Sequence, residues 1–452
     1  MLSVEENEIL TRVRAGTPMG RMMRRFWLPI CSSHQLPGPD CDPLRTKLLG
    51  EPFVVFRDSG GKVGVLDEFC VHRRASLALG RVEDGGIRCL LHGWKFTTDG
   101  TILETPNHCA ENVKQKIKQP AYPVREAGGM VWTYIGPKEQ EPPFPHYAFF
   151  DGPGENLVVL RINTAVNYLQ LYEGGTDSSH VGILHMNMMN PGWKDQTFTS
   201  GDTKASGGVK VGESDGTLSS KTAMYVSADL FASAPDLSIE DTEYGYHYAA
   251  LRDGPNAEDG SETWSVRITP VMLPIGRMIP AIAFGFYVFE APMDDTETAT
   301  YVVFHGKEAL DRQAMIDTMG LADERFWNDR DCNFRAGWDD RLGQDRASFG
   351  HNWSGYTGIE QEDAVIALSM GPIVDRSKEY LVPADEGVIR LRRRLLDSVK
   401  RHEAGEDPIA LAVTEYADID APADIIIPKG SDWQSLVPNN MGLGRPTKAA
   451  AE

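Results

Sequence analysis

Several residue patterns are missing from this sequence of 452 residues, and each absence excludes a class of protein. No run approaches the roughly 18 apolar residues that a membrane-spanning helix needs, so we expect no membrane span. The start, MLSVEENEIL, carries acidic residues where a secretory signal peptide would have a basic start and an apolar core. Six cysteines are too few for a disulfide scaffold in a chain of this length, and we expect a cytoplasmic protein.

Positive charge is also in short supply, because 45 Lys and Arg stand against 65 Asp and Glu, for a formal net charge of -20. Nucleic acid is therefore not an expected partner, since phosphate binding needs a concentrated basic surface. No G-x-G-x-x-G sequence opens a βαβ unit, so the chain shows no NAD or flavin fingerprint. If the protein carries out redox chemistry, its electrons must come from another protein.

The order of predicted elements divides the chain into three parts. Residues 1–40 begin with a helical pattern and are expected to pack on the large C-terminal domain. Residues 41–145 contain short β-type runs separated by Gly-containing turns, which is typical of a small antiparallel β domain. In residues 146–452, strands alternate with helical stretches. This order predicts an α+β domain, in which a curved antiparallel sheet carries helices on one face.

Two mixed couples of thiol and imidazole lie in CVHRRASLALGRVEDGGIRCLLHGWKF: Cys70 with His72, and Cys89 with His92. A structural zinc site is one interpretation, but zinc-finger sequences usually group the two Cys in one couple and the two His in the other. A Rieske 2Fe–2S cluster needs two Cys on one iron and two His on the other. Two loops that each provide one Cys and one His would clamp both irons, so the mixed couples predict a Rieske centre.

A second group of candidate metal ligands lies in NYLQLYEGGTDSSHVGILH, which contains Asp177, His180 and His185. Two histidines five residues apart do not share one face of a regular helix, so this pair alone is weak evidence for a metal site. Gly182 would allow a local break that turns both rings to one point. Two histidines and a distant carboxylate form the facial triad of non-haem Fe(II) oxygenases, which leaves positions open for dioxygen. After a Rieske motif, this spacing predicts a mononuclear iron.

With both motifs in place, the chain resembles the large, terminal oxygenase subunit of the Rieske non-haem iron oxygenases. It is most similar to the phthalate-dioxygenase-like branch, which includes aromatic demethylases. The resemblance covers nearly the whole chain, including PMGRMMRRFW, EGGTDSSHVGILH and SMGPIVDR. It implies a Rieske domain joined to a catalytic domain of the helix-grip (START-like) type. Val71 stands where the family usually has proline, and we expect its N–H to donate towards a cluster sulfur.

The resemblance also implies roles for two carboxylates. The third iron ligand of the family is an Asp that opens a helix shortly before the SMGPIVDR segment, and Asp363 in GIEQEDAVIALSMGPIVDR matches it. The adjacent Glu362 is the alternative. Asp177 matches the bridging carboxylate of the family, which accepts a hydrogen bond from a cluster histidine of a neighbouring subunit. A homotrimer with electron transfer between subunits is therefore implied.

The implied cofactors are a Rieske 2Fe–2S cluster and mononuclear Fe(II), with O2 as co-substrate. NADH would be oxidised by a separate reductase, which in this branch commonly carries FMN and its own 2Fe–2S cluster. The expected reaction is hydroxylation or dealkylation of an aromatic compound, and cis-dihydroxylation of an aromatic carboxylate is the alternative within the family. A Rieske electron carrier without oxygenase chemistry is the alternative from another class.

The substrate is less well defined by the sequence. Phthalate users carry an Arg where His247 stands, which argues against phthalate and favours a less anionic aromatic or an N- or O-alkyl aryl compound. Four aromatic residues are candidates for the substrate pocket, although each also suits an ordinary core: Phe231, Phe284, Phe286 and Trp353.

Overall fold

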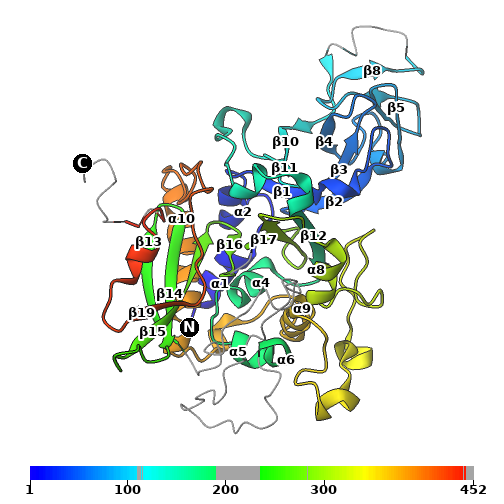
Figure 1. Ribbon diagram of the computed structural model, residues 1–452. Coiled ribbons are helices and arrows are strands. Elements are labelled where there is room, and N and C mark those ends of the chain that lie inside the picture. Colours follow the sequence, from blue (N-terminus) through cyan, green and yellow to red (C-terminus); the bar gives the residue numbers. More distant parts are fainter. Residues whose placement is uncertain (109–113, 115, 190–234, 282–283, 441, 444–452) are drawn as a thin grey trace. The chain divides into compact units, whose positions relative to one another are not determined.

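The computed structural model describes residues 1–108, 114, 116–189, 235–281, 284–440 and 442–443 (Figure 1). The chain forms two compact units. Unit 1 consists of Met1–Thr11, Pro145–Glu290 and Thr296–Glu452, and unit 2 of Arg12–Phe144 and Ala291–Asp295. The expected segment 1–40 is thus divided between the two units. Within the described residues, no helix is both long enough and apolar enough to cross a membrane.

Unit 2 contains three small antiparallel sheets and the helix α2 (Pro18–Met23). The first sheet has the order β1 (Leu28–Ser32), β11 (Met130–Thr133), β10 (Val124–Ala127). The second has the order β2 (Leu44–Leu48), β3 (Glu51–Arg57), β4 (Val63–Asp67), β9 (Ala121–Tyr122). The third has the order β5 (Arg81–Glu83), β6 (Gly86–Arg88), β7 (Lys95–Phe96), β8 (Ile102–Glu104). These strands form the small antiparallel β domain that the turn pattern predicts.

The second and third sheets of unit 2 share one apolar core. Phe56 from β3 and Phe96 from β7 are fully buried in it, together with the two cysteines of the mixed couples. Gly64 permits the close approach of β4 to the backbone at Thr98, because a Cβ at position 64 would lie 2.8 Å from the Cα of Thr98. Both cysteines are therefore part of a well-packed core.

Unit 1 is built on one large antiparallel sheet. Its strand order is β12 (Leu157–Thr164), β18 (Thr298–Gly306), β17 (Phe284–Pro292), β16 (Gly276–Met278), β15 (Thr263–Met272), β14 (Gly245–Asp253), β13 (Asp236–Thr242), and β19 (Ile425–Pro428) also pairs with β15. Because side chains alternate along a strand, this sheet has two distinct faces. On β14 and β15, one face carries the directly opposed pair Tyr248 and Thr269, and the other carries Ala249 and Ile268, which pack against Trp433.

The helices of unit 1 are α1 (Val4–Thr11), α4 (Tyr168–Gly174), α5 (Val181–Leu184), α6 (Met186–Met189), α8 (Arg312–Thr318), α9 (Ile359–Ser369) and α10 (Glu386–Glu403). Side chains of α8 and α9 bury the apolar face of β12, β17 and β18. Helices α4 and α9 lie side by side (Figure 1). The single helical region expected at the N-terminus is broken into α1 and α2, with Gly16 at a φ of 87° between them. This break also coincides with the boundary between the units.

A buried ionic network explains the SMGPIVDR segment. Arg376 is fully buried, and its Nη2 donates to Oε2 of Glu173 in α4 at 2.8 Å. Arg392 in α10 donates to the same carboxylate at 2.6 Å, and Nη1 of Arg376 donates to Oδ1 of Asn7 in α1 at 3.1 Å. This network joins three helices of unit 1, which gives the motif a structural role.

Replacing Arg376 by methionine is expected to lower the free energy of unfolding of unit 1 by about 3–5 kcal/mol, because Glu173 would lose a buried charged partner. Lys378→Met is the matched control, since Lys378 is exposed and pairs only with Asp375 within the described residues. Urea unfolding followed by circular dichroism measures the difference. Equal midpoints for the two variants would contradict a stabilising role for the network.

Candidate metal centres and substrate cavity

The two mixed couples of unit 2 lie in loops with the same hydrogen-bond pattern. The N–H of Cys70 donates to the carbonyl oxygen five residues later, and its own carbonyl oxygen accepts from the N–H of Arg74. Cys89 makes the corresponding two bonds, with Gly93 in the place of Arg74. Arg74 and Gly93 both have a positive φ, of 63° and 77°. The sequence therefore folds both couples into equivalent turns, one with the favourable glycine and one without.

These turns bring the side chains of the couples together. The ring centroids of His72 and His92 lie 4.5 Å apart, and both cysteines are buried. Nδ1 of His92 is buried without a hydrogen-bond partner among the described residues, as expected of an atom reserved for a metal. Burial raises the pKa of the Cys70 thiol, so a metal ion is needed to hold it as a thiolate at neutral pH. The donor set thus fits a Rieske cluster.

Two further contacts involve residues of the first couple's turn: Trp94 stacks on His72, and the N–H of Val71 has a hydrogen-bond partner. The indole of Trp94 stacks on the imidazole of His72, with centroids 4.6 Å apart and an interplanar angle of 1°, so it orders this ring. The expectation that the N–H of Val71 donates towards a cluster sulfur is wrong. This N–H donates to Oε1 of Gln119 at 2.7 Å, because the buried carboxamide lies on that side of the loop.

In unit 1, His180, His185 and Asp363 converge from two elements. His180 immediately precedes α5 and His185 immediately follows it, while Asp363 lies in the first half of α9. One ligand atom from each residue can be chosen so that all three lie within 4.8 Å of one another. Nε2 of His185 is 3.4 Å from Oδ1 of Asp363, and Nε2 of His180 is 3.8 Å from it. Ligands about 2.1 Å from one metal ion are roughly 3–4 Å apart, so this set fits a single ion.

The spacing of the two histidines has a simpler origin than a break at Gly182. This glycine lies inside α5, and the helix ends at His185, where φ and ψ are −89° and 27°. A four-residue helix with one histidine at each end turns the two rings towards each other, with centroids 5.1 Å apart. The two rings therefore converge as predicted. They do so because the helix ends after Leu184, and not because it breaks at Gly182.

Glu362 and Asp363 point to different partners. Oε2 of Glu362 lies 2.7 Å from Nδ1 of His185, and its Oε1 accepts from the hydroxyl of Ser354 at 2.5 Å. Burial alone would lower the pKa of His185, but the carboxylates of Asp363 and Glu362 outweigh it and raise that pKa to about 10. Glu362 thus holds the far side of the His185 ring, which leaves Nε2 directed at Asp363.

A cavity opens beside these three residues, between the sheet and helices α5 and α9. Its apolar lining is suited to an aromatic ring: Val181, Ile279, Pro280, Phe286, Val288, Met319 and Ile359. The charged lining includes Arg267, Arg277 and Glu360. Burial raises the pKa of Glu360 to about 8, so its side chain is mostly neutral at pH 7. The cavity is therefore largely apolar and has a few polar groups near the candidate iron ligands.

Asp177 also lines this cavity. Its Oδ1 accepts from the N–H of Ser179 at 2.7 Å, and its Oδ2 is 3.7 Å from Nδ1 of His180. Burial alone would raise the pKa of Asp177, but His180 and the Ser179 amide outweigh it and lower that pKa. The carboxylate is thus ionised and next to the face of His180 that points away from Asp363.

Of the other predicted pocket residues that the structure describes, one lines the cavity. Phe286 lines the cavity, whereas Phe284 packs in the core under α8 and α9. His247 lies on the opposite face of β14 from Tyr248, fully buried and 2.7 Å from Oε2 of Glu240, so it does not line this cavity. Trp353 does not line it either, and Phe231 falls outside the described residues.

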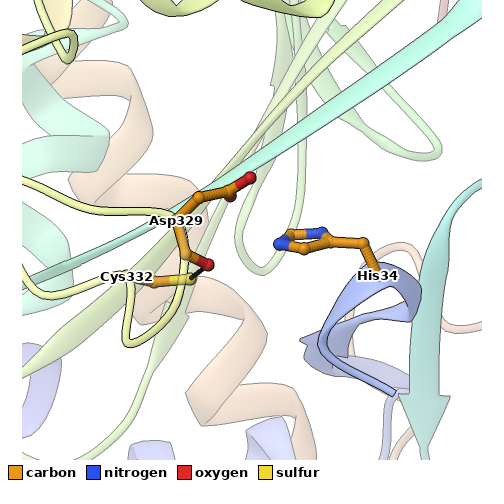
Figure 2. Close-up of side chains that lie close together, drawn as sticks. All are labelled: His34, Asp329 and Cys332. Carbon is orange, nitrogen blue, oxygen red and sulfur yellow. Dashed lines mark hydrogen bonds between the residues drawn. The ribbon is translucent and has the colours of Figure 1, made fainter. Parts of the chain in front are cut away.

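Figure 2 shows Cys332, a thiol of unit 1 in the segment that follows α8, where the next residue, Asn333, pairs with Asn163 of β12. The thiol of Cys332 donates to the carbonyl oxygen of Asp329 at 3.6 Å, and the Asp329 carboxylate accepts from Arg312 at 2.6 Å. Burial raises the pKa of Cys332 to about 11. His34, drawn in the same figure, belongs to unit 2. Cys332 is therefore a buried thiol that is hydrogen-bonded within its own loop.

Comparisons with known proteins match both halves of the chain. The family described as "LigXa C-terminal domain like" matches residues 133–448, and the "Rieske [2Fe-2S] domain" matches residues 26–122. The chain is 35% identical over 440 residues to the phthalate 4,5-dioxygenase oxygenase subunit of Pseudomonas putida, covering 96% of this chain and 94% of that protein. This chain belongs to the Rieske oxygenases.

Other Rieske oxygenase subunits are similar over the same length. The 3-chlorobenzoate-3,4-dioxygenase oxygenase subunit of Comamonas testosteroni is 30% identical, covering 96% of this chain and 98% of that protein. The 5,5'-dehydrodivanillate O-demethylase oxygenase subunit of a Sphingobium species is 27% identical, covering 91% and 84%. Among solved structures, Pseudomonas putida CBB5 NdmA with caffeine has a TM-score of 0.55 at 18% identity, covering 91% of this chain and 98% of that one.

Membership of the Rieske oxygenases establishes the class of enzyme. The protein is the terminal oxygenase component of a multicomponent system, an oxidoreductase that carries a Rieske cluster and a mononuclear iron. It works with a small-molecule substrate and a separate electron-transfer partner. This replaces the zinc interpretation of the mixed couples and the interpretation as a simple electron carrier.

Proposed function

We propose that this Rieske oxygenase hydroxylates or dealkylates an aromatic compound at the cavity of unit 1. The mononuclear iron would be held by His180, His185 and Asp363. The observation that carries the proposal is the convergence of two imidazoles and one carboxylate in the wall of a largely apolar cavity. The cluster would be held by the residues of the mixed couples, Cys70, His72, Cys89 and His92.

The residues around the proposed iron divide the work among themselves. When bound, the iron supplies the binding and reduction of O2, and the cluster supplies electrons one at a time. Glu362 accepts from Nδ1 of His185 and keeps its Nε2 free to bind metal, and Ser354 holds Glu362. Phe286 and Val288 offer an apolar wall that binds the ring and excludes water.

Electrons would reach the cluster from a separate reductase that oxidises NADH, and this reductase would carry FMN and its own 2Fe–2S cluster. The chain would form a homotrimer in which Asp177 accepts a hydrogen bond from a cluster histidine of a neighbouring subunit. Two features support this role: the pKa of Asp177 is lowered, and its carboxylate lines the cavity 3.7 Å from Nδ1 of His180. The solved oxygenase–ferredoxin complex of carbazole 1,9a-dioxygenase, similar in fold, contains a separate electron carrier.

A second candidate reaction is cis-dihydroxylation of an aromatic carboxylate. It is favoured by Arg277 in the cavity lining, whose buried Nε has no hydrogen-bond partner among the described residues. Nη1 of Arg277 donates to Glu290 at 2.9 Å, and Arg267 lies 3.3 Å from Asp424, so both positive charges are already largely balanced. The neutral or weakly anionic aromatic therefore remains the first choice.

A substrate screen tests both candidates. The purified protein is mixed with a generic NADH-dependent reductase, and NADH oxidation is measured with neutral N- or O-methyl aryl compounds and with aryl carboxylates. Products formed under labelled O2 are identified by mass spectrometry. One labelled oxygen atom in a phenol, or formaldehyde released from a methyl group, supports the first candidate, and a labelled cis-diol supports the second. Iron- and sulfide-loaded protein that oxidises no aromatic compound of either kind would refute the proposal.

A further inference from the structure

The side chain of Gln119 lies buried beside the first cluster loop, with 1% of its surface exposed. Its Nε2 donates to the carbonyl oxygens of Asp67 at 2.9 Å and Phe69 at 3.1 Å. Its Oε1 accepts from the N–H of Val71 at 2.7 Å. Two acceptors on one side and one donor on the other fix the orientation of the carboxamide. One side chain therefore satisfies three backbone groups within five consecutive residues.

Two of these groups flank Cys70. The carbonyl oxygen of Phe69 belongs to the peptide group before Cys70, and the N–H of Val71 belongs to the peptide group after it. Since peptide groups are planar, holding both of them fixes the two backbone dihedrals of Cys70 and the direction of its Cα–Cβ bond, from which Sγ extends. No side chain among the described residues is hydrogen-bonded to either peptide group that flanks Cys89. The first loop alone has this support.

Gln119 is itself held from two sides. Its backbone N–H donates to the carbonyl oxygen of Gly100 at 3.0 Å, and the next residue accepts from the N–H of Asp67 in β4 at 3.0 Å. Gly100 has a φ of 80°, and a Cβ there would lie 1.9 Å from the carbonyl oxygen of Gln119. Only glycine permits this approach. The position of the carboxamide is thus set by protein groups.

We propose that Gln119 is a positioning residue of the Rieske centre, which fixes the peptide groups on both sides of Cys70 and thereby sets the reduction potential and the retention of the cluster. The inference rests on the proposed ligand role of Cys70. Potentials of iron–sulfur clusters depend on the geometry and hydrogen bonding around their sulfurs, and partners that orient ligands affect metal retention. A buried carboxamide with three satisfied bonds would provide such control through the backbone of the first loop.

Gln119→Met tests the proposal, because methionine fills a similar volume without making these bonds. Val71→Pro removes one bond from the other end, since proline has no N–H. Gln140→Met, at an exposed position of the same unit, and Val71→Ala, which keeps the N–H, are the controls. The midpoint potential is measured by spectroelectrochemistry and the half-life of the visible chromophore in a chelator, both in the full-length protein.

We expect Gln119→Met and Val71→Pro to shift the midpoint potential in the same direction and to shorten the half-life of the cluster, by about 10-fold for Gln119→Met. The double variant should match Gln119→Met, and both controls should match the wild type. A Gln119→Met protein with wild-type potential and half-life overturns the proposal, as do fully additive effects in the double variant. If Gln119→Met does not fold, a Val71→Pro protein indistinguishable from Val71→Ala overturns it. Wild-type protein without sulfide would instead refute the cluster assignment itself.

Discussion

Replacing Asp363 by alanine is expected to leave a protein that keeps its Rieske cluster but has lost stoichiometric mononuclear iron and all product formation. Asp363 is the carboxylate nearest to Nε2 of both His180 and His185, at 3.8 and 3.4 Å. Burial alone would raise the pKa of Asp363, but the two histidines and Arg277 outweigh it and lower that pKa, so the group is ionised and ready to bind a cation. Metal analysis together with acid-labile sulfide gives the two iron populations separately.

Glu362→Gln is the matched variant, since it changes the adjacent carboxylate and keeps its size. We expect this protein to bind mononuclear iron about 10–100-fold more weakly and still to form product when iron is in excess, because Glu362 orients His185 without being a ligand. Competition with a chelator of known affinity measures the loss. If Glu362→Gln abolishes iron binding while Asp363→Ala retains it, the two roles are reversed.

The second large effect concerns Asp177. Asp177→Ala is expected to retain both metal centres and to lower turnover by on the order of 100-fold, because the charged bridge between His180 and a neighbouring cluster histidine would be lost. Stopped-flow measurement of cluster reoxidation, with substrate and O2 present, identifies the slowed step. Turnover at the wild-type rate would show that Asp177 is no bridge.

A local role of Asp177 is separated from the bridging role by Asp177→Asn. In the native protein, Oδ1 of Asp177 accepts from the N–H of Ser179 at 2.7 Å. Asparagine keeps an oxygen atom for this bond but has no negative charge. If bridging depends on the carboxylate, Asp177→Asn should be nearly as slow as Asp177→Ala. A fast asparagine variant beside a slow alanine variant would show that Asp177 only orders the loop before α5.

The metal-binding motifs are the part of this molecule that the sequence predicts best. Ligands of one metal centre come in short, fixed spacings, so the couples at 70–72 and 89–92 and the pair His180 and His185 are visible without a structure. The prediction that Asp363 joins that pair, although it lies 178 positions after His185, depends on family resemblance. No local rule connects the start of a helix to a distant loop. The structure brings it together with the histidines.

Two kinds of feature are not predictable from this sequence: hydrogen bonds to backbone groups, and the face of the sheet on which a side chain lies. β15 is hard to predict from sequence, because TWSVRITPVM contains an arginine and a proline that argue against a buried strand. Its cavity face carries polar side chains such as Arg267, and its apolar residues point the other way. Because of the same alternation, His247 lies on the face of β14 opposite Tyr248, away from the cavity. Gln119 gives no signal in the sequence, since its role depends on three backbone atoms.

The alternation of side chains on β14 and β15 limits how evolution or engineering can retune this enzyme. Tyr248, Thr269 and Arg267 meet the substrate space, whereas their immediate neighbours along each strand are buried against Trp433 and its surroundings. Changes at every second position would alter which compounds are accepted, and changes in between would instead cost expression and heat tolerance. A mutant library for new substrates is therefore best confined to one parity of these two strands.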